Sequence, residues 1–135
     1  MGLALLDTSI VIAVLNHRDT LYPAARRSLL AARDRHALAM SALTYAEIVV
    51  GPLRAGEDAV EIVERFAAQA AILDITAPIA RLAAELRANR NIKLPDAVIL
   101  ATGLWHRADV ILTGDVRWKG IETVRVVGGA GRAGS

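Results

Sequence analysis

Short apolar runs alternate with longer segments of helical periodicity along almost the whole chain. Leu3–Leu6 is apolar throughout, as is typical of a parallel strand that is buried on both faces. The run Thr123–Val127, near the C-terminus, is rich in β-branched residues, which also favour strands. The predicted strands are Leu3–Leu6, Ala37–Met40, Ala71–Ile75, Asp109–Thr113 and Thr123–Val127.

Between these strands, apolar residues recur at the spacing of one helix face. We expect Thr8 or Ser9, Ser41 and Thr76 to be N-caps, because their hydroxyls accept from free backbone N–H groups. Gly51-Pro52 is expected to end the helix that begins at Ser41. The helices are expected to run through Asn16, from Pro23 to Arg33, through Val50, over Glu57–Gln69, through Leu86, and from Pro95 to Arg107.

This alternation predicts one α/β domain, residues 1–127, built as a three-layer α/β/α sandwich around about five parallel strands. The segment 128–135 reads as a flexible Gly/Ala/Arg tail. Within it, Gly129–Gly134 matches G-x-G-x-x-G, yet no helix follows to direct its N-terminus at a pyrophosphate. We therefore interpret this match as a coincidence.

Composition excludes several classes of protein. Cysteine is absent, which rules out disulfide scaffolds, thiolate zinc sites and cysteine nucleophiles. No apolar run approaches the length of a membrane span, and the N-terminus lacks the basic flank of a signal peptide. We expect a protein without a membrane segment, located in the cytoplasm. The formal net charge is +2, which says little about partners until the positions of the acids are considered.

Four acidic residues occur among apolar or small neighbours rather than among other charges. Asp7 follows the first strand, Asp115 follows the fourth, and Asp96 and Glu47 lie early in helices. Each has an ordinary structural explanation, such as capping a helix or pairing with an arginine. Together, their positions predict a group of acids at the carboxyl ends of the strands, where open α/β sheets bind ligands.

Several carboxylates gathered at one edge repel one another and raise each other's pKa. A divalent cation relieves that repulsion, and Mg²⁺ or Mn²⁺ suits oxygen ligands. His17, His36 and His106 show no obvious ligand spacing. The residues thus favour a carboxylate site for a hard cation over a histidine-based one.

These motifs resemble those of the PIN-domain family, specifically the VapC-type toxins of bacterial toxin–antitoxin pairs. The resemblance rests on Leu-Leu-Asp7-Thr-Ser, Tyr-Ala-Glu47-Ile, Leu-Pro-Asp96-Ala-Val and Leu-Thr-Gly-Asp115, and it spans about Leu3 to Val127. It implies a PIN-like fold and a Mg²⁺- or Mn²⁺-dependent endoribonuclease. The implied metal ligands and catalytic residues are Asp7, Glu47, Asp96 and Asp115. Thr8, Ser9 and Thr113 fall where the family keeps small hydroxyl residues that support those carboxylates.

The implied reaction is hydrolysis of RNA phosphodiesters, leaving a 5′-phosphate and a 3′-hydroxyl by family precedent. The number of metal ions and the identity of the RNA stay open. Arg18, Arg117 and Lys119 are candidates for phosphate contacts, although an ordinary solubilising surface explains them equally well. Trp105 is expected in the core, and Trp118 either stacks on a base or anchors the loop after Asp115.

Other functions remain to be weighed. An aspartate-based phosphatase usually has a second acid two residues after the first, but Ser9 stands there. A phosphoryl-receiver domain needs paired acids and a suitably placed lysine, and neither Lys93 nor Lys119 fits. The remaining alternative is a catalytically inactive PIN-fold domain that binds RNA or protein.

The resemblance also implies partners: a VapB-like antitoxin that obstructs the acidic site, and a second copy of the chain in a homodimer. With the four acids set aside, the remaining residues carry a clear basic excess. We therefore expect an acidic, metal-filled site within an arginine-rich surface that attracts a polyanion.

Overall fold

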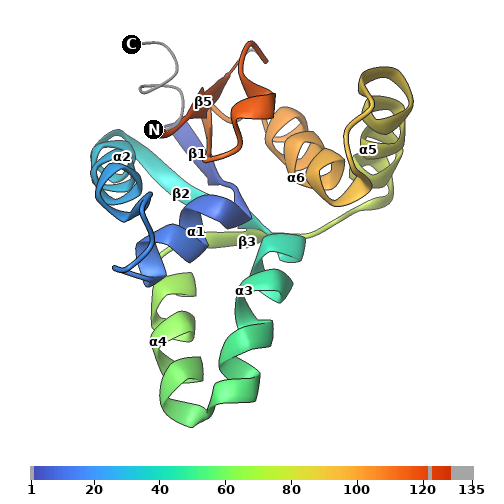
Figure 1. Ribbon diagram of the computed structural model, residues 1–135. Helices are drawn as coiled ribbons and strands as arrows, with labels where there is room; N and C mark the ends of the chain where they lie inside the picture. Colours follow the sequence, from blue (N-terminus) through green and yellow to red (C-terminus); the bar gives the residue numbers. More distant parts are fainter. Residues whose placement is uncertain (1, 122, 129–135) are drawn as a thin grey trace.

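The centre of the protein is a sheet of five parallel strands in the order β3-β2-β1-β4-β5 (Figure 1). The computed structural model describes residues 2–121 and 123–128. The strands are β1 (Gly2–Leu6), β2 (His36–Ser41), β3 (Ala71–Leu73), β4 (Val110–Thr113) and β5 (Val124–Val126). The predicted five-stranded parallel sheet is confirmed, although β3 and β5 are shorter than expected. Both are edge strands, and each has only one neighbour to pair with.

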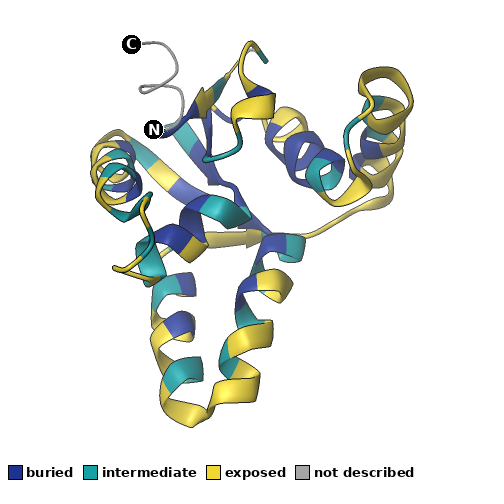
Figure 2. Cartoon of the chain, in the orientation of Figure 1, coloured by how far each residue is buried: buried dark blue, intermediate teal, exposed yellow. Residues whose placement is uncertain are grey.

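Helices cover both faces of this sheet, as the three-layer prediction requires. They are α1 (Thr8–Leu15), α2 (Tyr22–Arg35), α3 (Ala42–Ala55), α4 (Glu57–Ala67), α5 (Ala77–Arg90), α6 (Leu94–Trp105) and the short 3₁₀ helix η1 (Val116–Trp118). Residues of α1 and α2 pack with Ala4 and Leu6 of β1, whereas residues of α6 pack with Leu5. Neighbouring residues of one strand therefore serve two separate cores, which are buried along the centre of the molecule (Figure 2).

Two of the predicted helix N-caps are confirmed, and a third is wrong. The Ser41 hydroxyl accepts from the N–H of Leu43 at 3.1 Å, and Thr76 accepts from Ile79 at 3.4 Å, so both predicted caps are confirmed. The expected cap at Thr8 or Ser9 is wrong. Asp7 is the N-cap of α1, and its side chain makes no capping hydrogen bond. The carboxylate is thus left for other contacts.

The predicted end of α3 at Gly51-Pro52 is also wrong, because the helix continues to Ala55. Proline removes only one backbone donor, and the Pro52 carbonyl still accepts from the N–H of Gly56 at 3.0 Å. The turn comes at Gly56, whose φ of 136° is open to glycine and strained for other residues. As a result α3 and α4 form a long helical hairpin that projects from the sheet (Figure 1).

Two further expectations need comment. Trp105 was expected in the core but is 53% exposed, at the last residue of α6. The expected tail and the Gly129–Gly134 match fall on residues that lie, apart from Gly128, outside the described part of the chain. No helix in residues 2–121 or 123–128 combines the length and apolarity needed to span a bilayer.

Candidate functional site

Asp7 lies at the carboxyl end of β1, in the centre of the sheet, and is only 5% exposed. Its backbone N–H donates to the carbonyl of Leu112 in β4 at 2.9 Å. Two hydroxyls donate to its Oδ2 atom: Ser9 Oγ at 2.7 Å and Thr113 Oγ1 at 2.8 Å. The carboxylate is therefore held in one orientation by side chains from two different elements.

The same two hydroxyls also fix the loop that follows β4. Ser9 Oγ accepts from the N–H of Gly114 at 2.9 Å, and Thr113 Oγ1 accepts from the N–H of Asp115 at 3.0 Å. Each hydroxyl thus donates to Asp7 and accepts from the neighbouring loop, so both of its hydrogen-bonding functions are used. This network ties the first acid to the strand end that carries the fourth.

Glu47 approaches from α3, where it projects from an exposed position. Thr8 Oγ1 donates to Glu47 Oε1 at 2.6 Å and lies 3.0 Å from the hydroxyl oxygen of the buried Thr44. Thr8 therefore orients Glu47 much as Ser9 and Thr113 orient Asp7. Thr8, Ser9 and Thr113, the hydroxyl residues expected to support the acids, each donate a hydrogen bond to a carboxylate.

Asp96 lies in the first turn of α6, and its pKa is raised above the ordinary carboxyl value. Burial is the largest cause, and the negative charges of Asp7, Asp115 and Glu47 also raise it. Arg117 acts in the opposite direction. The other three acids singled out in the sequence therefore all act on Asp96, although the four come from parts of the chain that are far apart.

Asp115 forms the start of η1 and is paired with Arg117. The backbone N–H of Arg117 donates to Asp115 Oδ1 at 2.9 Å, Nε donates to the same oxygen at 2.9 Å, and Nη2 donates to Oδ2 at 2.5 Å. The Arg117 hydrogen bonds hold the pKa of Asp115 below its usual range. Arg117 Nη2 also lies 3.8 Å from Asp96 Oδ2, so one guanidinium serves both acids.

The donor chemistry of this cluster fits a hard divalent cation, because it offers carboxylate oxygens in a region of concentrated negative charge. The four carboxylates are not arranged as a closed metal site. Among the described residues, no group of three or more His, Cys, Asp or Glu is placed so that it could hold a metal ion. Arg117 lies against Asp96 and Asp115 and supplies positive charge there.

The residues predicted to bind RNA have separate surroundings. Arg18 is exposed in the turn after α1, and Lys119 is exposed at the end of η1. Arg117 is at the acidic cluster, where it pairs with carboxylates. Trp118 is 1% exposed, so it anchors the loop after Asp115, and the base-stacking alternative is wrong.

Sequence reasoning missed a basic pocket beside the acids, with a volume of about 440 Å³. None of the residues between Leu86 and Pro95 was predicted as a site residue, although the close spacing of Arg87, Arg90 and Lys93 was a signal. The basic pocket is lined by Arg87, Arg90, Asn91, Ile92, Lys93, Asp96, Arg117 and Trp118.

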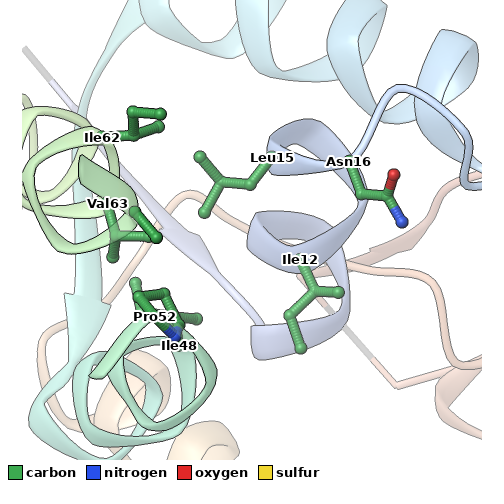
Figure 3. A pocket seen from close by; sticks show the side chains of 8 residues that line it. Ile12, Leu15, Asn16, Ile48, Pro52, Ile62 and Val63 are labelled. Carbon is green, nitrogen blue, oxygen red and sulfur yellow. The ribbon is translucent and has the colours of Figure 1, made fainter. Parts of the chain in front are cut away.

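On the other side of the acids, an apolar groove of about 320 Å³ runs between α1, α3 and α4 (Figure 3). Ile12 and Ile62 point into this region and remain 47% and 56% exposed. The apolar groove is lined by Ile12, Leu15, Asn16, Ile48, Pro52, Ala59, Ile62 and Val63.

These features define an α/β protein with a carboxylate cluster at the carboxyl edge of a parallel sheet. The chain belongs to the PIN domain family, whose model matches residues 4–123. The predicted family is therefore confirmed. None of the curated proteins matches the sequence closely enough to count as a relative.

Solved structures from toxin–antitoxin systems are similar to this chain. A chain of a toxin–antitoxin complex from Klebsiella pneumoniae is 30% identical, with a TM-score of 0.80 over 91% of this chain and 96% of that one. A chain of VapBC2 from Rickettsia felis, bound to a fragment of promoter DNA, is 18% identical, with a TM-score of 0.77 over 93% and 98% of the two chains. Mycobacterium tuberculosis VapC20, a toxin that cleaves the sarcin–ricin loop, is 20% identical, with a TM-score of 0.68 over 90% and 98%. Because the Rickettsia felis and Mycobacterium tuberculosis chains are only 18% and 20% identical, their likeness to this chain shows the fold alone.

Proposed function

We propose that this protein is a metal-dependent endoribonuclease, the VapC-like toxin of a type II toxin–antitoxin pair. The observation that carries the proposal is the raised pKa of Asp96, which results from burial and from the charges of Asp7, Asp115 and Glu47. Carboxylates whose charges disfavour one another favour the binding of a compensating cation. The family membership of the chain agrees with this chemistry.

Asp7, Glu47, Asp96 and Asp115 are the residues that would hold Mg²⁺ or Mn²⁺. Held by these residues, the cation would lower the pKa of a water and would neutralise charge on the phosphodiester oxygens. Ser9 and Thr113 keep Asp7 in a fixed orientation, and Thr8 does the same for Glu47. Asp96 and Asp115 become available as ligands when Arg117 leaves them, which frees the guanidinium for a phosphate oxygen.

A VapB-like antitoxin is the proposed partner, because the 30% identical relative comes from a toxin–antitoxin complex. The apolar groove suits a helix of that partner, since it exposes Ile12 and Ile62 beside a helical hairpin. We further propose a homodimer that acts in the cytoplasm, where an RNA-cleaving toxin meets its substrate.

Purified protein incubated with structured RNA tests the nuclease directly. We expect cleavage in Mn²⁺, none in EDTA, and none by Asp7→Asn or Asp96→Asn variants that keep the circular dichroism of the parent. Cleavage that survives EDTA or both substitutions would contradict the proposal. RNA binding without cleavage would instead identify the catalytically inactive PIN-fold alternative.

A further inference from the structure

The basic pocket defined above lies immediately beside the acidic cluster and shares Asp96 and Arg117 with it. Arg90 at the end of α5 and Lys93 at the N-cap of α6 are both exposed and add positive charge. Asp96 is the one acidic residue that lines it. The pocket therefore has a strongly cationic edge that continues into the candidate metal site.

The loop that carries these cations has a defined shape. Arg87 Nη1 donates to the carbonyl of Ile92 at 2.9 Å, which closes the turn between α5 and α6. Asn91 ends α5 in the left-handed region, with φ of 53° and ψ of 42°, a conformation that asparagine tolerates well. Arg87 thus supports the loop, while Arg90 and Lys93 are available to a ligand.

The basic pocket has apolar lining beside its charged side chains, and half-buried Ile92 contributes to it. A small inorganic anion has no use for such a surface, whereas a nucleotide carries an apolar base and sugar next to its phosphate. The N-terminus of α6 adds a further favourable field for a phosphate group.

We infer that the basic pocket is a binding subsite for single-stranded RNA that flanks the cleaved phosphodiester. Arg90 and Lys93 contact backbone phosphates, and the apolar part of the lining at Ile92 accommodates a base or sugar without reading its identity. This inference rests on the proposed function, because the acidic cluster next to the pocket is where the scissile phosphate would lie.

Binding of a short fluorescein-labelled single-stranded RNA, followed by anisotropy in Mg²⁺, tests the inference. The full chain carries Asp7→Asn throughout, so that no RNA is cut. Adding Arg90→Gln with Lys93→Gln should weaken binding about tenfold and reduce the slope of log K against log salt by about 1.4, since each lost single-strand phosphate contact removes about 0.7.

The matched control is Arg26→Gln with Arg27→Gln, which removes the same charge from exposed positions on α2, across the sheet from α5 and α6 (Figure 1). This control should change affinity less than twofold. Equal losses in both double variants would overturn the inference, because net charge alone would then explain binding. Displacement of the RNA by low concentrations of inorganic phosphate would also overturn it, since the pocket would then recognise only an anion.

The cleavage assay separates this inference from the nuclease proposal. In the chain that keeps Asp7, the Arg90→Gln and Lys93→Gln pair should raise KM severalfold and leave kcat nearly unchanged. A chain that never cleaves RNA but whose RNA binding still depends on Arg90 and Lys93 would support the subsite and refute the nuclease. If the double variant cleaves RNA with an unchanged KM, the result would support the nuclease and refute the subsite.

Discussion

Arg117 donates hydrogen bonds to both carboxylate oxygens of Asp115, and its Nη2 atom lies 3.8 Å from Asp96 Oδ2. The guanidinium therefore supplies, from within the chain, the positive charge that the acidic cluster requires. Arginine stays protonated at any physiological pH, so this counter-charge does not depend on conditions. A divalent ion that binds Asp96 and Asp115 has to displace it.

Replacing Arg117 with glutamine should consequently tighten Mn²⁺ binding severalfold, because the competing cation is gone. Titration calorimetry on the purified chain measures this directly. RNA binding should weaken in the same variant, since it lacks the guanidinium that donates to a phosphate oxygen in the parent protein. Lys119→Gln is the matched control, because it removes one nearby charge from an exposed position. If the two variants bind Mn²⁺ with the same affinity, Arg117 does not compete for the site.

Asp96→Asn should stabilise the metal-free protein at neutral pH while abolishing cleavage. The folded state raises the pKa of Asp96, so it holds the proton more tightly than the unfolded chain does. The free energy of unfolding therefore falls as pH rises from the ordinary carboxyl pKa to the raised one, and the loss persists above that window. Asparagine removes this penalty, and we expect the Tm to rise by a few degrees.

Thermal melts in EDTA across the acidic to neutral range check this prediction. The gain should vanish below the ordinary carboxyl pKa, where Asp96 is protonated in both states. Asp74→Asn, at an exposed position whose charge is not among the causes of the raised pKa of Asp96, should show no such gain. A variant at Asp96 that is destabilised at every pH would argue that its carboxylate is a structural partner and carries no charge penalty.

The sequence predicted the layers of the fold well, because the information is local. A buried parallel strand such as Leu3–Leu6 is apolar on both faces, and a cap such as Ser41 bonds only two residues along the chain. Trp105 shows the limit of this reasoning. Helical spacing identifies a face of a helix, but it does not tell whether another element covers that face at its end.

The contacts within the candidate site were harder to predict because they are distant in sequence. The resemblance implied that Thr113 supports one of the carboxylates, but the particular bond to Asp7 joins the end of β4 to the residue that follows β1, 106 positions away in the chain. The basic pocket was missed for the same reason, because it forms only where Arg117 and Trp118 of η1 lie beside the end of α5 and the start of α6.

Thr113→Val should lower the free energy of unfolding by about 1–3 kcal/mol, because a fully buried hydroxyl joins Asp7 to the N–H of Asp115. Valine keeps the volume and leaves both partners without this bond. Cleavage and Mn²⁺ affinity should fall as well, since Asp7 loses a fixed orientation. Urea denaturation reports the stability. Thr113→Ser keeps the hydroxyl and should retain most of the metal affinity; if it behaves like valine, packing of the methyl group is the main contribution.

Ile12→Glu or Ile62→Glu should weaken binding of the cognate antitoxin without reducing cleavage by the free toxin. Both side chains are about half exposed in the apolar groove, so a charge there costs little in the isolated chain. A partner helix would have to bury that charge against apolar residues, and a central contact of this kind is worth about 2 kcal/mol or more. Affinity should therefore fall more than tenfold in a binding assay with the purified antitoxin. Ile75→Glu alters an isoleucine of similar exposure, 42%, outside the apolar groove, and should bind normally. Equal binding by all three variants would place the antitoxin on another surface and leave the nuclease proposal untouched.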